Sequence, residues 1–364
     1  MTLLELRCKP SMVVGVDTHK ETHHAAVLGE HGALLEVREF PADTAGYAEL
    51  TDWIEGFGRV GAVGIESTGS YGAGLTRFLR ERSFDVREIN QPHHHTKARV
   101  GKDDAIDAEA AARKVLSGSS AVTPKDTTGI VESIRMLQVA RRSAVKSRTI
   151  ALNQFQGVLV TAPATLRESI KGRWTRVKVR QCAVLRPDLD RLCEPLQAAK
   201  VALRSICRRI QDLDEEIALL DVQLHQLVKQ CCPSLLGRVG IGVQHAAQLI
   251  VTAGENLDRL DNEAAFARLC GVAPVPASSG KTRRMRLHKG GDRQANRALH
   301  LIVVVRLRYD ERTRNYMARR TQEGLSKRDV MRCLKRFVAR EVFGELKRDL
   351  LLGVVAQGPA THLA

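Results

Sequence analysis

An ordered succession of short apolar runs between residues 12 and 116 constrains the fold of this 364-residue chain more than any other feature. The pattern predicts three consecutive strands, followed by helices that alternate with strands. The predicted elements are strands at 12–16, 24–28 and 34–40, a helix at 45–54, a strand at 62–65, a helix at 73–82, a strand at 86–89 and a helix at 104–116. This order predicts an α/β domain over residues 11–122, with an antiparallel flank on its sheet.

Charge is divided unevenly between this domain and the rest of the chain. Residues 1–122 hold 14 Lys and Arg against 18 Asp and Glu, whereas the later residues hold 43 against 23. A basic excess on a folded chain indicates a polyanionic partner, because Lys and Arg release condensed counterions when they contact phosphates. A basic solubility surface is the alternative. Aromatic residues make up 4% of the chain, so we expect phosphate contacts rather than base stacking to dominate recognition.

The middle of the chain, residues 130–230, has a long helical pattern. Apolar residues three or four apart predict two long helices that pair as a coiled-coil connector, broken near Pro163 and again near Pro187. Within it, residues 135–180 contain 11 Lys and Arg against one Glu. We therefore expect one helical face, including Arg141 and Arg142, to contact nucleic acid, although a solvated face would look the same.

The last third predicts a second compact, mostly α-helical domain over residues 233–351. Its first segment, a glycine-rich stretch at 236–243 followed by a helix at 244–251, resembles a helix-hairpin-helix. Such a motif holds phosphate with backbone N–H groups at a glycine turn and a helix N-terminus. A tight glycine turn between packed helices is the competing interpretation.

Cysteine spacing and hydropathy indicate the compartment. The eight cysteines form no CxxC pair and no Cys/His cluster of zinc-site spacing, so we expect reduced, mostly buried thiols of a cytosolic protein. The N-terminus has no signal-peptide pattern, and the longest apolar run, residues 299–305, is too short to cross a bilayer. We therefore expect a soluble protein with no membrane partner.

Acidic residues follow two of the predicted strands and open one predicted helix. Asp17 ends the strand at 12–16 and Glu66 ends the strand at 62–65, where a buried carboxylate is costly unless it is paired or binds a cation. Asp104 and Asp107 stand three residues apart at a helix start and so share a face, while Asp103 is expected to point elsewhere. Helix capping is the alternative role for acids at this position.

Four converging carboxylates repel one another unless divalent cations neutralise them. Oxygen ligands of this kind suit Mg²⁺, with Mn²⁺ as the alternative. Two such ions about 4 Å apart can stabilise the attacking and leaving oxygens of a phosphoryl transfer, so the acids predict phosphodiester chemistry. The run His93 to His95 is interpreted as polar loop residues near nucleic acid, because adjacent side chains in an extended loop point in different directions.

A loop dense in cations, Pro and Gly lies at residues 269–292. Taken alone, its Ser278 and Ser279 are typical turn residues. Together with the other motifs, however, the loop resembles part of a known family. The motifs GVDTHK, GIESTGSYG, KDDAIDAEAAAR, VGIGVQHAAQL, GVAPVPASSGKTRR and HKGGDRQANRALH, in this order, resemble the transposases of the insertion sequence 110 family. The resemblance extends from about residue 12 to residue 344.

This resemblance implies a ribonuclease-H-like, RuvC-like nuclease domain, in agreement with the order of the predicted elements. It implies that Asp17, Glu66, Asp104 and Asp107 are its metal-binding acids. It also implies that the serine before the glycine of the loop, Ser279, is a nucleophile, although the neighbouring Ser278 blurs the assignment. A covalent phosphoserine link would conserve bond energy for rejoining. Cations expected to hold the phosphate are Lys281, Arg283, Arg284, Arg286 and Lys289.

The family further implies several partners. A structured bridge RNA would pair with donor and target DNA, so that base pairing chooses the sequence. Protomers, as dimers that assemble into a tetramer, would share active sites with help from the coiled coil. Such a protein would act in the bacterial cytoplasm, at the nucleoid.

Three other functions compete with this interpretation. A junction-resolving hydrolase would use the same four acids with water as the nucleophile. A sugar-kinase-like ATPase also begins with a strand-end Asp, but it needs a glycine-rich phosphate loop where this chain has Thr18, His19 and Lys20. A silent nucleic-acid-binding protein, such as a decayed transposase, is disfavoured because the four acids and the serine are all present.

Overall fold

The structure, a computed structural model, describes residues 12–89, 103–118, 121–280 and 285–356. The chain divides into two compact units, which are described separately. The first unit contains residues 1–129 and 254–261, and the second contains residues 130–253 and 262–364. The histidine run at 93–95 lies outside the described residues.

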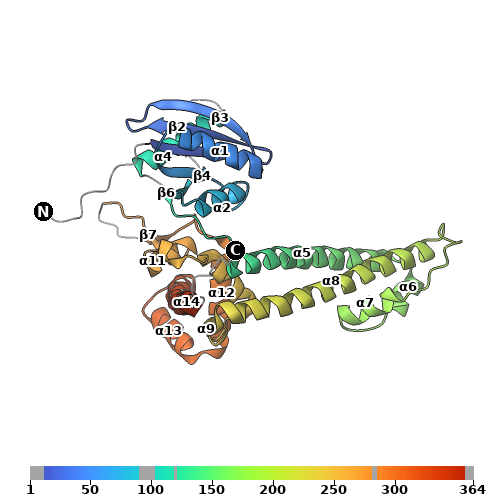
Figure 1. Cartoon of the computed structure of the whole chain (residues 1–364). Coiled ribbons are helices and arrows are strands. Elements are labelled where there is room, and N and C mark those ends of the chain that lie inside the picture. The colour runs from blue at the N-terminus through green and yellow to red at the C-terminus, as the bar shows by residue number, and fades with distance from the viewer. Residues whose placement is uncertain (1–11, 90–102, 119–120, 281–284, 357–364) are drawn as a thin grey trace. The chain divides into compact units, whose positions relative to one another are not determined.

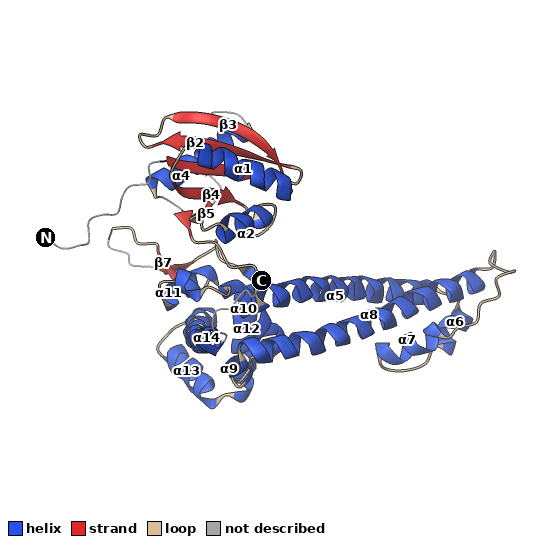
Figure 2. Ribbon diagram, in the orientation of Figure 1, coloured by secondary structure: helices blue, strands red, loops and turns tan. Residues whose placement is uncertain are grey.

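The first unit is built on a six-stranded sheet with helices packed against it (Figures 1 and 2). Its strands are β1 (Met12–Thr18), β2 (Thr22–Gly29), β3 (Leu34–Pro41), β4 (Val60–Glu66), β5 (Val86–Ile89) and β6 (Ala121–Val122). Their order across the sheet is β3-β2-β1-β4-β5-β6, with β1, β4 and β5 parallel and the other pairings antiparallel. Its helices are α1 (Thr44–Gly56), α2 (Ala73–Glu81) and α4 (Asp104–Ser117), with a short 3₁₀ turn at Leu257–Arg259. The expected α/β fold with an antiparallel flank is confirmed.

Alternation along β1 sorts its side chains between two apolar layers, because successive residues of a strand point to opposite faces. Val14 and Val16 pack into the core that α1 and α2 complete with side chains such as Leu50 and Leu79. Val13 belongs instead to a smaller cluster with residues of α4. The sheet is therefore apolar on both faces where β1 runs.

Glycine in β1 lets α4 approach the sheet closely. A Cβ added at Gly15 would lie 2.1 Å from the backbone N of Ala112 and 2.2 Å from the carbonyl O of Ala108. No side chain fits there unless the helix moves. Gly15 therefore allows α4, the helix that carries Asp104 and Asp107, to pack closely on β1.

The second unit begins with two long helices, α5 (Ile130–Thr161) and α8 (Pro195–Cys231), which run side by side (Figure 2). Two short helices, α6 (Ala164–Ser169) and α7 (Thr175–Ala183), lie between them in the chain, so the helical pattern breaks at Pro163 and again around Pro187, as expected. Phe155 of α5 and Leu203 of α8 are fully buried in their shared apolar cluster. The two long helices are confirmed, while a separate connector domain and its coiled-coil geometry stay predictions.

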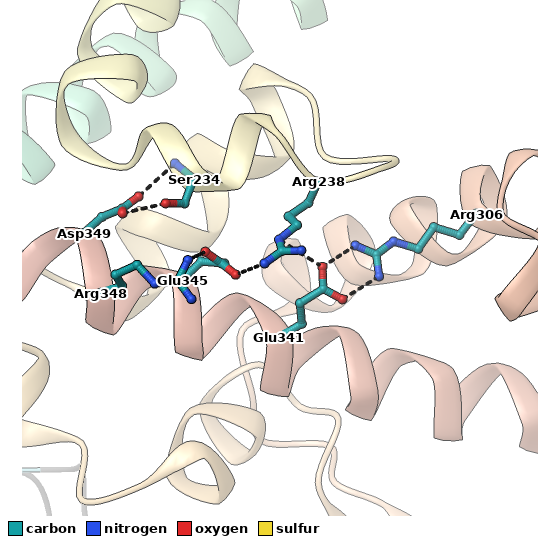
Figure 3. Close-up of polar contacts among 7 residues, drawn as sticks. All are labelled: Ser234, Arg238, Arg306, Glu341, Glu345, Arg348 and Asp349. Carbon is teal, nitrogen blue, oxygen red and sulfur yellow. Dashed lines mark hydrogen bonds and ion pairs between the residues drawn. The ribbon is translucent and has the colours of Figure 1, made fainter.

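The remainder of the second unit is mostly helical, as predicted. Its elements are α9 (Pro233–Leu236), α10 (Val243–Ala253), α11 (Glu263–Leu269), the hairpin β7 (Pro274–Pro276) and β8 (Met285–Leu287), α12 (Arg293–Tyr309), α13 (Glu311–Gln322) and α14 (Lys327–Ala356). A network of ion pairs and hydrogen bonds connects the segment around α9, helix α12 and helix α14 (Figure 3).

In that network, Arg238 lies between two acids of α14 (Figure 3). It pairs with Glu345, which is 3% exposed, and its Nε lies 3.8 Å from Glu341. Arg306 of α12 donates two hydrogen bonds of 2.8 Å to Glu341. Ser234 donates a further bond of 2.7 Å to Asp349. These contacts fix α9 with the turn that follows it, and also α12, to α14.

Two further observations concern the cysteines and the hydropathy of the helices. The described cysteines are free, and most are buried: Cys182, Cys207, Cys231, Cys232 and Cys270. No helix among the described residues is long and apolar enough to cross a membrane.

Candidate active site

Asp17 and Glu66 lie at the ends of two neighbouring parallel strands. Val16 of β1 is in register with Ile65 of β4, so the two acids follow side by side. The Thr18 hydroxyl donates a hydrogen bond of 3.0 Å to the backbone carbonyl of Glu66, which ties the two strand ends together. Both acids are buried, Asp17 at 8% exposure and Glu66 at 5%. The sheet therefore brings these two predicted site residues to one edge.

The first turn of α4 supplies the other two acids. The side chain of Asp103 accepts a hydrogen bond of 3.1 Å from the backbone N–H of Ala105, so Asp103 is the helix N-cap. Asp104 and Asp107 then follow in the first helical turn. Asp103 was expected to point away from Asp104 and Asp107, and its capping contact agrees with that expectation.

Electrostatics show that three of these acids share one environment. The pKa of Asp17 is raised, first by burial and then by the nearby charges of Asp107 and Asp104, while His19 acts in the opposite direction. Repulsion of this kind disfavours the ionised form of a buried carboxyl group. A bound cation would reverse that preference.

His19 also lies among these acids, although it was not among the residues predicted from the sequence. Its Nδ1 lies 3.8 Å from Asp17 Oδ2 and its Nε2 lies 3.8 Å from Asp104 Oδ1. His24 on β2 flanks the same carboxylate, with Nε2 3.9 Å from Asp104 Oδ2 and 3.5 Å from Glu39 Oε2. The signal was visible in the GVDTHK motif, where a histidine stands two residues after the strand-end acid.

These residues fit a divalent cation. One ligand atom each from Asp17, His19 and Asp104 lies within 4.8 Å of the others. Nδ1 of His19 is buried and has no hydrogen-bond partner within the described part of the chain, and a buried polar atom of this kind calls for an explanation. A cation held here would supply Lewis-acid stabilisation of developing charge on a phosphate.

Ser279 lies in the second unit, in the loop between β7 and β8. These strands pair antiparallel, with Val275 opposite Arg286. Ser278 and Ser279 are both exposed, and the next residue, Gly280, has a left-handed φ of +54° that favours glycine. The structure therefore presents both serines at the surface of the unit.

The predicted phosphate-binding cations differ in how they are placed. Arg286 and Lys289 are exposed, whereas Lys281, Arg283 and Arg284 lie outside the described residues.

On α5, Arg141 is 20% exposed, and its Nε is 2.6 Å from Asp221 of α8. Arg142 is exposed and donates a hydrogen bond of 2.8 Å to Gln138. Arg141 thus has a structural partner that the sequence did not reveal, while Arg142 keeps an accessible surface.

The segment that resembles a helix-hairpin-helix joins two helices through a glycine turn. Gly240, between α9 and α10, has a φ of +81°. Residues other than glycine adopt this left-handed backbone conformation only with strain. Both the phosphate-binding and the packing interpretation need such a turn, so the motif stays a prediction.

Comparison with known proteins finds transposases over both units. A family model for the DEDD transposase of IS110 matches residues 14–162, and a model described as transposase of the IS116/IS110/IS902 family matches residues 234–318. Over 131 residues the chain is 26% identical to the insertion element IS900 uncharacterized 42 kDa protein of Mycobacterium paratuberculosis. The aligned region covers 35% of this chain and 33% of that protein. It is 28% identical over 131 residues to the insertion element IS110 uncharacterized 43.6 kDa protein of Streptomyces coelicolor, covering 34% and 31%. The chain spans about a third of the length of the curated relatives it matches.

Proposed function

The chain belongs to the insertion sequence 110 family of transposases, and from this membership we propose that it cuts and rejoins DNA strands to move an insertion element. The first family match contains all four acids, and the second contains Ser279. The observation that carries the proposal is the buried carboxyl group of Asp17, whose pKa is raised by burial and by Asp107 and Asp104. Ionised carboxylates this close together repel one another unless a cation neutralises them. A cation bound by them can stabilise the charge that develops on a phosphate.

In this proposal the first unit is a RuvC-like nuclease domain. Asp17, Glu66, Asp104 and Asp107 hold Mg²⁺, or Mn²⁺ as the alternative. The paired ends of β1 and β4 and the close packing of α4 on Gly15 support it, because they fix carboxylates from three elements. The cation supplies charge stabilisation at the scissile phosphate.

The serine supplies the covalent step. Ser279 Oγ attacks the phosphorus of one phosphodiester, a P–Oγ bond forms, and the bond to the leaving sugar oxygen breaks. The hydroxyl proton passes from the serine to solvent water, and the departing sugar oxygen takes up a proton from water. Exposure of Ser279 and of the nearby cations Arg286 and Lys289 supports this role, because a DNA strand can reach them.

The proposed partners follow from family membership and charge. Donor and target DNA are the substrates, and a noncoding bridge RNA pairs with both. The excess of basic residues after residue 122 supports contact with nucleic acid phosphates. Dimers that assemble into a tetramer bring the acids of one protomer to the serine of another. The protein acts in the bacterial cytoplasm, at the nucleoid.

The experiment that tests this proposal looks for a covalent adduct. The full chain is incubated with element-end DNA, Mg²⁺ and RNA transcribed from the element's flanks, and the products are resolved on a denaturing gel. We expect a protein–DNA adduct with the wild type that disappears in Ser279→Ala and in Asp17→Ala. Ser278→Ala is the matched control and should keep the adduct. An adduct that survives Ser279→Ala and disappears in Ser278→Ala would reassign the nucleophile.

A second candidate function is hydrolysis by a junction-resolvase-type nuclease. The observation that favours it is that the four acids all belong to the first unit. Water could therefore serve as the nucleophile without the serine hairpin, which is the pair β7 and β8 with the loop that holds Ser278 and Ser279. Hydrolysis predicts metal-dependent cleavage with free ends on both sides of the cut. Cleavage that is unchanged in Ser279→Ala and gives no adduct would establish it.

A further inference from the structure

A histidine stands between two acids that come from different elements of the first unit. Asp17 belongs to β1 and Asp104 to the start of α4, and the imidazole of His19 faces one with each ring nitrogen. The two separations are equal, at 3.8 Å. Neither is a hydrogen bond, because N–H···O bonds are normally about 2.7–3.2 Å long.

A separation of 3.8 Å suits two ligands of one metal ion better than a direct contact. With bonds of about 2.1 Å, neighbouring ligands of an octahedral ion lie about 3.0 Å apart and opposite ligands about 4.2 Å apart. The distance between His19 Nδ1 and Asp17 Oδ2 falls between these values. An ion can therefore reach both atoms with small side-chain adjustments.

The two nitrogens of His19 differ in their surroundings. Nδ1 is a buried atom with no hydrogen-bond partner among the described residues, although 44% of the side chain is exposed. Nε2 faces a carboxylate, as the second nitrogen of a metal-bound histidine commonly does. Nδ1 is therefore the ring nitrogen available to an ion beside Asp17, while Nε2 faces Asp104 at 3.8 Å.

We propose that Nδ1 of His19 is a ligand of the divalent cation at the acidic site, so that this chain holds its metal with nitrogen as well as oxygen. The inference rests on the proposed metal-dependent function and deepens it. Imidazole nitrogen favours transition-metal ions, whereas Mg²⁺ prefers oxygen. His19 therefore biases the site of this chain towards Mn²⁺.

Pulsed electron paramagnetic resonance on the full chain loaded with Mn²⁺ gives a direct readout that does not depend on activity. A coordinated imidazole produces a ¹⁴N modulation of the electron spin echo, which changes when the protein is labelled with ¹⁵N-histidine. We expect the modulation in the wild type and its loss in His19→Ala. His31→Ala is the matched control, because it removes an exposed histidine from the same unit, and the modulation should remain.

Affinity provides a second measurement. By calorimetric titration, His19→Ala should weaken Mn²⁺ binding by about tenfold or more and change Mg²⁺ binding much less. His19→Asp keeps a ligand at this position but replaces nitrogen with oxygen. We expect it to retain Mn²⁺, to lose the ¹⁴N modulation and to gain affinity for Mg²⁺.

The outcomes separate this inference from the function on which it rests. Mn²⁺ that binds the wild type without ¹⁴N modulation would overturn the histidine ligand and leave the four-acid site standing. A modulation that survives His19→Ala and disappears in His24→Ala would assign the nitrogen to the neighbouring histidine instead. A wild type that binds neither Mn²⁺ nor Mg²⁺, alone or with DNA, would overturn the proposed metal-dependent function itself.

Discussion

The two units place their candidate functional groups in opposite ways. In the first unit, Asp17 and Glu66 are 8% and 5% exposed, and they sit on strands whose register leaves them little freedom. In the second unit, Ser279 is exposed in the loop of a short hairpin beside a helical scaffold. The fold therefore buries the two acids and leaves the serine exposed.

This difference follows from the chemistry that each group would perform. Carboxylates that bind a cation must be held close together against their own repulsion, and a sheet edge with a tightly packed helix does so. A nucleophile that attacks a DNA strand must be accessible to that strand. The buried acids and the exposed serine therefore fit a division of labour between a preformed metal site and a substrate-facing loop.

The largest expected effect tests whether the buried acids are a working metal site. Glu66→Gln should lower the rate of metal-dependent DNA cleavage by about 10³-fold, because it removes a charged ligand at a strand end. The same variant should fold normally, since Gln is isosteric and no longer buries a charge. Cleavage rates and circular dichroism measure the two properties. Glu55→Gln, at an exposed position of α1, is the control, and equal rates for the two variants would remove Glu66 from the site.

The next effect tests whether backbone packing fixes the metal site. Gly15→Ala should cost about 3 kcal/mol of unfolding free energy, because its Cβ would meet the backbone of α4 at Ala108 and Ala112. If α4 moves, Asp104 moves with it, so Mn²⁺ affinity should fall as well. Urea unfolding and metal titration measure the two quantities.

Gly69→Ala is the matched control for this packing test. It changes a glycine of the same unit around which a Cβ would meet nothing within 4 Å. Its stability and its metal affinity should stay near the wild-type values. Gly15→Ala with unaltered metal affinity would show that the position of α4 does not set the site.

Much of this comparison could be predicted from the sequence. Apolar runs mark strands and amphipathic helices, so β1 to β5, α1, α2 and α4 were located to within a few residues, whereas the two-residue strand β6 and the 3₁₀ turn at Leu257–Arg259 were not predicted. The two strand-end acids followed from the same pattern, because Asp17 and Glu66 interrupt apolar runs. Asp103 was set apart from Asp104 because consecutive residues at a helix start point in different directions, and in the structure Asp103 is the helix N-cap.

Contacts between distant parts of the chain could not be predicted in this way. His19 lies in the turn between β1 and β2, and no periodic pattern in the sequence specifies the path of such a turn. Its place between Asp17 and Asp104 therefore depends on tertiary packing. Arg141 looked like a nucleic-acid contact, but its partner Asp221 is 80 residues away in the chain. Charge counts along the sequence do not reveal which cations are already paired.

A smaller effect tests the scaffold beside the serine hairpin. Glu341→Gln should lower the stability of the second unit by about 1–2 kcal/mol at pH 7, because it weakens two hydrogen bonds from Arg306. Those bonds hold the pKa of Glu341 below its ordinary value of 4.5. A lowered pKa adds stability above the unfolded-state value, and this stability is lost as pH falls through the folded-state value.

Denaturant titrations of the wild type and Glu341→Gln across pH measure this prediction. The stability difference should be full at pH 7, narrow below pH 4.5 and vanish once Glu341 is protonated in the folded state. Glu311→Gln, an exposed position at the start of α13, is the control and should show a small difference. A Glu341→Gln difference that persists at low pH would mean that packing, rather than the charge on Glu341, is responsible.

The smallest effect separates an accessible cation from a structural one. Arg286→Ala on β8 should weaken DNA binding by less than about 1 kcal/mol and reduce the slope of log affinity against log salt by about 0.9, as one lost phosphate contact does. Arg141→Ala should instead lower stability and leave the slope unchanged, because Arg141 already pairs with Asp221. Binding titrations at several salt concentrations measure both. If Arg141→Ala changes the slope and Arg286→Ala does not, the nucleic-acid surface lies on α5 rather than on the serine hairpin.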